Sequence, residues 1–319
     1  MANILVLGGT GFLGRHVCEQ LQRAGHRMTV PTRHLRNAAA VQHLPLLTVQ
    51  TANVHDPATL TQLVAGHDAV VNLVAVLHGN EQRFEQVHVT LPQTLAQACQ
   101  ANGVKRVVHV SALGAGVDAP SMYQRSKARG EAVLQAAGLA LTVLRPSVIF
   151  GSGDRFLNLF ARMQALLPVF PLAGADTRMQ PVWVEDVARA VLHALHTPAT
   201  AGHTLEAVGP EVFTLRQLAE MAGAAVGHPR PVLGLPRALA YFQALALACA
   251  PGEPLLSPDN LSALEVDNVA SPADAAQANL ATWGLPTASL HAVLPTYLGQ
   301  VTGGNGPRHR LLGFRAQAR

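Results

Sequence analysis

The stretch NILVLGGTGFLG, residues 3–14, determines the fold expected of this chain. Residues 4–7 form a short continuous apolar run, which is typical of a strand buried on both faces of a parallel sheet. Glycines follow at positions 8, 9, 11 and 14, and apolar residues then recur at helical spacing as far as Leu21. A strand, a glycine turn and a helix in this order predict a dinucleotide-binding turn, because the free N–H groups of the first helical turn can hold a pyrophosphate.

Strand-like and helix-like segments alternate from this turn as far as Pro146. Predicted strands lie at residues 27–30, 46–49, 69–74, 105–110 and 141–144, and predicted helices lie at residues 81–101 and 121–137. Pro92 lies inside the first of these helices and predicts a kink there. The alternation predicts an α/β fold, a Rossmann-type doubly wound parallel sheet with ligands at the carboxyl ends of its strands.

The pattern becomes less regular after Gly151. Helices are predicted at residues 156–167, 184–196 and 215–225, and one strand at residues 204–207. We therefore expect an NAD(P)-binding Rossmann domain at residues 1–150, a smaller mixed α/β substrate or docking lobe at residues 151–302 that is partly interleaved with it, and a mobile basic tail at residues 303–319.

The composition narrows the function classes. Of the 319 residues 49% are hydrophobic and only 13% charged, and the net charge of +4 is not arranged as a strip of basic and aromatic residues, so no nucleic-acid partner is expected. Three scattered cysteines indicate a reducing compartment. Met1 leads directly into the first strand, and the apolar run at residues 238–250 is shorter than the roughly 20 residues that span a bilayer, so we expect a cytoplasmic protein.

The end of the second predicted strand indicates which nicotinamide cofactor is bound. An NAD site usually carries an acid about 20 residues after the glycines, to bind the ribose 2′-hydroxyl. Here the end of that strand holds Thr32 and Arg33, and the only acid before Asp56 is Glu19. A guanidinium binds a 2′-phosphate, so NADP(H) is favoured and NAD(H) is the alternative. Arg15 is assigned either to the same phosphate or to the helix surface.

Tyr123 and Lys127 are the candidate catalytic pair. They lie four residues apart on the helix predicted at residues 121–137, so both side chains project from one face. A nearby ammonium stabilises a phenolate and moves the tyrosine pKa from about 10 toward the working range. The pair predicts proton transfer by Tyr123, with Lys127 also holding the nicotinamide ribose; an exposed helical pair is the alternative.

Four motifs resemble the extended short-chain dehydrogenase/reductases: GGTGFLGRHV at 8–17, YQRSKARGE at 123–131, LRPSVIFG at 144–151 and QPVWVEDVARA at 180–190. The likeness covers roughly the first 210 residues. Three further motifs, SALGA at 111–115, GDRFLN at 153–158 and PLLSPDN at 254–260, resemble the atypical branch that contains the NADPH-binding accessory subunit of mitochondrial complex I and its bacterial relatives.

The resemblance implies a set of cofactor-binding residues spread along the Rossmann half. They are Gly8, Thr10, Gly11, Phe12, Leu13 and Gly14 in the glycine turn, Asn53 and Val54 beside the adenine, Leu73, Val74 and Ala75 beside the ribose, and Pro146 and Val148 beside the nicotinamide. Asn53 stands where the family usually has an aspartate.

Two departures from the family pattern concern catalysis. Ser111 is the candidate third catalytic residue, but it falls slightly early and Leu113 occupies the more usual place; a cap on the strand end is the alternative function of Ser111. The family's helical asparagine is not evident, and His88 lies near its place. Loss of a second hydrogen-bond donor to the carbonyl costs a few kcal/mol of barrier.

Residues 236–250 are unusually apolar, with Arg237 as their only charge. They predict a buried helix of the smaller lobe or, alternatively, a helix that lies on a membrane or partner protein. The resemblance implies contact with a respiratory complex or with the inner face of the cytoplasmic membrane. No metal site is expected, because His193 and His196, one turn apart, have no evident third ligand.

The sequence leaves two main functions open. One is an oxidoreductase, or an epimerase/dehydratase-like enzyme, that uses NADP(H) on a carbonyl or quinone-like substrate. The other is a non-catalytic NADPH-binding accessory or assembly module of a respiratory complex or membrane. A cofactor-sensing regulator is less favoured, because the sequence contains no DNA-reading element.

Overall fold

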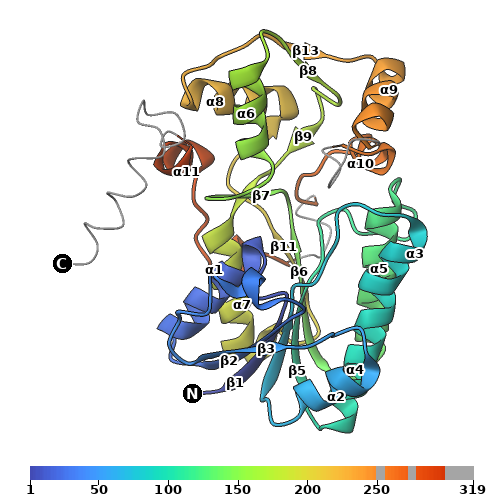
Figure 1. The fold of residues 1–319 in the computed structure, drawn as a ribbon, viewed down its shortest axis with the longest axis vertical. Helices are drawn as coiled ribbons and strands as arrows, with labels where there is room; N and C mark the ends of the chain where they lie inside the picture. The colour runs from blue at the N-terminus through green and yellow to red at the C-terminus, as the bar shows by residue number, and fades with distance from the viewer. Residues whose placement is uncertain (249–255, 272–277, 299–319) are drawn as a thin grey trace, which may run out of the picture.

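The computed structural model describes residues 1–248, 256–271 and 278–298 (Figure 1). One sheet of eight parallel strands runs through the Rossmann half in the order β14-β11-β6-β5-β4-β1-β2-β3. Its strands are β1 (Asn3–Leu7), β2 (Arg27–Thr32), β3 (Leu47–Thr51), β4 (Ala69–Asn72), β5 (Arg106–Val110), β6 (Ala140–Pro146), β11 (Thr204–Ala207) and β14 (Ala278–Asn279). The predicted doubly wound parallel sheet is confirmed.

Helices cover both faces of this sheet (Figure 1). They are α1 (Phe12–Arg23), α2 (Pro57–Val64), α3 (Glu81–Glu85), α4 (Leu91–Ala101), α5 (Met122–Gln135) and α7 (Val184–His196). Alternate residues of β1 face opposite sides: Ile4 packs with α1 and α7, whereas Leu5 packs with α2, α4 and α5. Burial on both sides explains why the strand is a continuous apolar run.

The smaller lobe lies beyond the carboxyl ends of the strands, in the upper half of Figure 1. Its helices are α6 (Leu157–Leu166), α8 (Leu215–Ala225), α9 (Arg237–Ala248), α10 (Pro258–Ala263) and α11 (Leu290–Tyr297), with short strands β7 (Ile149–Phe150), β8 (Phe170–Leu172), β9 (Arg178–Met179), β10 (Val182–Trp183), β12 (Phe213–Thr214) and β13 (Val232–Gly234). A second core, around Phe160, Phe170 and Leu218, joins α6, α8 and α11. The tail at residues 303–319 lies outside the described residues.

The apolar segment 236–250 forms α9, and its last residues, 249 and 250, lie outside the described part. The expectation of a buried helix holds for Ala240 and Ala244, but Phe242 is 68% exposed. Small side chains therefore face the lobe, and large ones face outward. No helix in the described ranges is both long and apolar enough to cross a bilayer.

The predicted helix at residues 81–101 is helical throughout, but its hydrogen-bonding pattern changes within it. A π-helical turn over Gln86–Thr90 separates α3 from α4. Pro92, the second residue of α4, has no N–H to donate to the carbonyl of His88, four residues earlier. The helix is therefore irregular immediately before Pro92. The kink predicted there stays a prediction. The π-turn lies against α5, where a Cβ on Gly130 would come within 1.9 Å of the His88 carbonyl oxygen.

Two histidines are buried beside this turn. His88 and His109 are each 2% exposed, and burial together with the charge of Lys127 lowers the pKa of His88 to about 2 and that of His109 to about 3. Both rings are therefore neutral in the folded chain at any pH near neutrality. The His88 ring accepts the N–H of Val76 on Nε2 at 3.1 Å and donates from Nδ1 to Ser126 Oγ at 2.8 Å.

Stability is expected to fall as pH falls below about 6.5, because the unfolded chain protonates these two histidines and the folded chain does not. Each contributes up to ~1.4 kcal/mol per pH unit to the slope. His109→Gln should lower the slope of unfolding free energy against pH by up to ~1.4 kcal/mol per pH unit. His34→Gln, at an exposed position, should leave this slope unchanged. Urea unfolding from pH about 7 to about 5 measures both; equal slopes in His109→Gln and the unaltered chain would contradict this prediction.

Candidate functional site

The glycine turn joins β1 to α1 through a very close backbone approach. Gly8 has φ +81°, and a Cβ there would lie 3.1 Å from the backbone of Leu73. A Cβ on Gly14 would lie 2.2 Å from the Gly8 carbonyl oxygen, so only glycine fits there. Gly11 caps α1 without a side-chain hydrogen bond in the described chain, and the first turn of α1 has no acid. Free N–H groups at a positive helix end suit a pyrophosphate.

Cationic side chains gather near the end of β2. Thr32 is buried as the last residue of the strand, and the adjacent Arg33 is exposed. Asn53, beyond β3, is also exposed, and its Oδ1 accepts the N–H of His55 at 3.2 Å. Burial and the charges of Arg83 and Arg33 lower the pKa of His55. Two guanidinium groups are therefore near the place expected for the adenosine.

The other predicted cofactor residues lie at the same edge of the sheet, because every strand is parallel. Leu73 donates its N–H to the Leu7 carbonyl at 2.9 Å, which places residues 73–75 beside the glycine turn. Pro146 is the last residue of β6. Two residues later, the carbonyl of Val148 accepts the N–H of Val182. Val54 and Val74 are partly buried against the core under α2. Leu13 is partly buried against the core under α1, and Thr10 is half-buried in the glycine turn.

Phe12 and Arg15 lie toward the smaller lobe. The ring of Phe12 is next to Gly151, where a Cβ would lie 3.8 Å from it. The Arg15 guanidinium lies over the same ring, 5.7 Å from its centroid, and donates to the Ser152 carbonyl. Arg15 is thus held by α1 and the loop after β7, whereas Arg33 is at the end of β2.

Lys127 is buried at the carboxyl end of β5. It is 2% exposed, and its Nζ donates to the Val110 carbonyl at 3.1 Å. Burial lowers the pKa of Lys127 to about 8, although the nearby Glu131 acts in the opposite direction. Glu131 is itself bound by both Nε and Nη2 of Arg145. The ammonium therefore has a backbone carbonyl as its acceptor and makes no direct ion pair with any residue that the structure describes.

Tyr123 is half-buried one helical turn before Lys127. Its ring packs edge-on against Phe84 and His88, with centroids 6.2 and 5.5 Å apart. Burial raises the pKa of Tyr123. This differs from the lowered pKa expected from the sequence, because the Lys127 ammonium is directed to Val110 and desolvation of the phenol dominates. The phenol is protonated at neutral pH and is a hydrogen-bond donor.

Ser111 and Leu113 continue the pairing of β5 with β6. Their N–H groups donate to the carbonyls of Leu144 and Pro146 at 2.7 and 2.8 Å. Alternation along the strand places both side chains on the same face as His109, toward α5. Ser111 Oγ and His109 Nε2 are buried and have no hydrogen-bond partner within the described residues. Ser111 thus makes no capping bond there, and two orphaned polar atoms lie near Lys127, as a site for a polar ligand requires.

Three residues connect this site, and the sequence had assigned a function to none of them, although it placed His88 near the family's asparagine. His88 is hydrogen-bonded both to Val76, in the loop after β4, and to Ser126 on α5. The Ser126 hydroxyl in turn donates to the Tyr123 carbonyl at 2.7 Å. Asp259, on α10, accepts the N–H groups of Met122 and Tyr123 at 2.6 and 3.1 Å. The only sequence signal for Asp259 was its place in the motif at 254–260, whose first two residues lie outside the described part.

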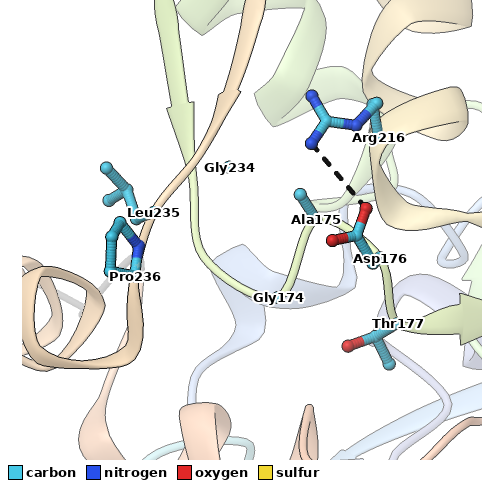
Figure 2. A pocket seen from close by; sticks show the side chains of 8 residues that line it. All are labelled: Gly174, Ala175, Asp176, Thr177, Arg216, Gly234, Leu235 and Pro236. Carbon is cyan, nitrogen blue, oxygen red and sulfur yellow. Dashed lines mark ion pairs between the residues drawn. The ribbon is translucent and has the colours of Figure 1, made fainter.

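A small polar pocket of about 310 Å³ lies in the lobe (Figure 2). Arg216 is paired there with Asp176 at 3.7 Å and also donates to the Val232 carbonyl. Other charges of the lobe are used within the protein: Arg178 binds Asp267 at 2.7 Å.

Two histidines elsewhere, His196 and His16, have hydrogen-bond partners on other segments. His196 does not pair with His193: its Nε2 lies 2.6 Å from Nε2 of His26. His16 comes close to Glu19 and Glu185, and its Nδ1 is 2.6 Å from a Glu185 oxygen, so a hydrogen bond joins α1 to α7 there.

The amino-acid sequence is similar to those of a known family and of several characterised proteins. The sequence model of the NAD dependent epimerase/dehydratase family matches residues 4–208. A mitochondrial protein of Mus musculus, NADH dehydrogenase (ubiquinone) 1 alpha subcomplex subunit 9, is 32% identical over 278 residues, which are 83% of this chain and 72% of that protein. The ceramide reductase of Caulobacter vibrioides is 28% identical over 235 residues, 73% of each chain.

The same fold is found in solved structures. UDP-N-acetylglucosamine 4-epimerase from Bacillus cereus superposes with a TM-score of 0.69 at 18% identity, covering 96% of this chain and 98% of that one. The predicted resemblance to extended short-chain dehydrogenase/reductases is confirmed. The chain belongs to the NAD dependent epimerase/dehydratase family, whose members bind a nicotinamide dinucleotide.

Proposed function

We propose that this chain is an NADP(H)-dependent oxidoreductase that reduces a carbonyl or quinone-like substrate. The observation that carries the proposal is Lys127, a buried ammonium with a backbone carbonyl acceptor and with Tyr123 one turn away, at the same sheet edge as the glycine turn. A buried charge with so little compensation is costly. The ribose hydroxyls of a bound cofactor would supply the missing hydrogen bonds.

The residues then take separate roles. The glycine turn and Leu73–Ala75 hold the dinucleotide, with Pro146 and Val148 beside its nicotinamide end. When bound, the reduced cofactor supplies a hydride to the carbonyl carbon. Tyr123 donates its phenolic proton to the carbonyl oxygen, so the product is an alcohol, and Lys127 stabilises the resulting phenolate until it is reprotonated. Ser111 is assigned as a second donor to the same oxygen.

Tyr123→Phe should reduce turnover by about 10²- to 10⁴-fold, because the proton donor is lost, while NADPH binding changes by no more than about twofold. Lys127→Met should lose turnover and also weaken NADPH binding. Lys105→Met removes the chain's other lysine, at an exposed position, and should change neither. NADPH oxidation with a panel of ketones and quinones, beside fluorescence titration of NADPH, measures both quantities; unchanged turnover in Tyr123→Phe would refute the assigned acid.

The preference for NADP(H) is assigned to the cations at the end of β2. Arg33→Ala should weaken NADPH binding about 10- to 100-fold, the value of one charge-assisted hydrogen bond to phosphate, and leave NADH binding unchanged. The matched control is Arg27→Ala, an exposed arginine at the opposite end of the same strand. Titration of each variant with both cofactors decides the matter. An equal loss for NADPH and NADH in Arg33→Ala would argue against a 2′-phosphate contact.

A second candidate function is a non-catalytic NADPH-binding module at a membrane or respiratory complex. Leu113 in the more usual place of the catalytic hydroxyl favours it, as does the name of the mouse relative, a subunit of an NADH dehydrogenase. The outer face of α9 also favours it, because Leu239, Phe242 and Leu245 are 56, 68 and 46% exposed. NADPH binding without turnover on any acceptor would select this function over the first.

We assign residues 236–250 to a contact with the cytoplasmic face of a membrane. Vesicles of phosphatidylglycerol and phosphatidylethanolamine should carry the chain upward in a density gradient, because apolar side chains of α9 enter the lipid interface. The pair of changes Leu239→Asp and Phe242→Asp should abolish flotation. Val117→Asp, at a site 71% exposed between β5 and α5, should not. Failure of the unaltered chain to float would rule out the lipid contact.

A further inference from the structure

A large groove lies between the smaller lobe and the start of α5. Its volume is about 1010 Å³, and its walls come from α9, α10 and the first turn of α5. Apolar side chains dominate the lining, among them Met122, Leu235, Ala238, Tyr241, Leu261 and Leu264. In Figure 1, α9 and α10 lie next to each other above α5. The groove thus reaches the residue immediately before Tyr123.

The four charged side chains of the lining are already used within the protein. Asp259 accepts the N–H groups of Met122 and Tyr123, and Arg237 is paired with Glu265. Arg125 donates to the carbonyls of residues 119 and 120 at 2.7 and 2.8 Å. A sugar or nucleotide placed in the groove would lose its hydration without gaining charged partners, which is unfavourable. An aliphatic chain pays no such cost, and its burial is favourable.

The groove is apolar along α9 and becomes polar at one margin. Gly174 and Leu235 line both this groove and the smaller pocket of Figure 2, in which Leu235 and Pro236 stand on one side and Arg216 with Asp176 on the other. The groove also adjoins the exposed side chains of α9, so a chain can enter from an apolar phase. A long, mostly apolar ligand with a polar end fits this arrangement.

We propose that the groove between α5, α9 and α10 binds the hydrocarbon chain of an amphiphilic substrate, such as a fatty acyl or isoprenoid chain, whose carbonyl is presented to Tyr123. The proposal rests on the proposed function, because it names the substrate class of that site. Asp259 joins the two, since it lines the groove and also holds the first two N–H groups of the helix that carries Tyr123.

The test uses the full chain and cis-parinaric acid, a fatty acid whose fluorescence rises in an apolar site. Ala238→Trp fills the groove from an exposed position on α9 and should weaken probe binding at least about tenfold. Leu239→Trp, the next residue, exposed but not in the lining, should leave probe binding unchanged. Palmitate should displace the probe, and UDP-N-acetylglucosamine should not. NADPH binding, titrated in parallel, should be equal in all three chains.

The outcomes separate the two proposals. Equal probe affinity in Ala238→Trp and Leu239→Trp, or displacement of the probe by UDP-N-acetylglucosamine, would overturn the groove assignment and leave the proposed function intact. If Ala238→Trp alone weakens probe binding, the groove is upheld as a hydrocarbon site. If the same experiment finds no NADPH binding to the unaltered chain, the proposed oxidoreductase is overturned.

Discussion

The close backbone approach between Gly8 and Gly14 is the constraint on which the rest of the structure depends. With a Cβ on Gly14 only 2.2 Å from the Gly8 carbonyl oxygen, any other residue would push α1 away from β1. The approach aims the first N–H groups of α1 past the end of β1, and it lets α1 pack against the sheet together with α7. The same turn lies against the backbone that leaves β4, so two strand ends and a helix end share one concave edge.

The helix α5 connects this edge to everything else in the site. Its Lys127 contacts the end of β5, and its Ser126 contacts His88 on the π-helical turn. The absence of a side chain at Gly130 lets that turn come close. At its start, α5 is capped by Ser121 from its own chain segment and by Asp259 from the smaller lobe. The position of Tyr123 therefore depends on both halves of the molecule.

Charge and apolar surface are separated in this chain. Cations lie near the end of β2, where the phosphate-bearing part of a dinucleotide is expected, and large exposed apolar side chains lie on α9 of the smaller lobe. The charged groups of the groove that α9 lines are paired within the protein. This distribution suits an anionic cofactor at the end of β2 and a hydrocarbon ligand beside α9. An enzyme with this arrangement could act on a substrate taken from a membrane.

The sequence by itself determined the local elements and their order. The alternation of strand-like and helix-like segments after the glycine turn at 3–14 predicted the parallel sheet. The helices α7 and α8 and the strand β11 have the bounds predicted from periodicity, because burial of one face leaves a regular pattern. Only the tertiary structure decided the outward face of α9 and the partners of His88, His109 and Asp259. Those depend on segments up to 137 residues apart that meet in space, and such contacts leave no periodic trace in a single sequence.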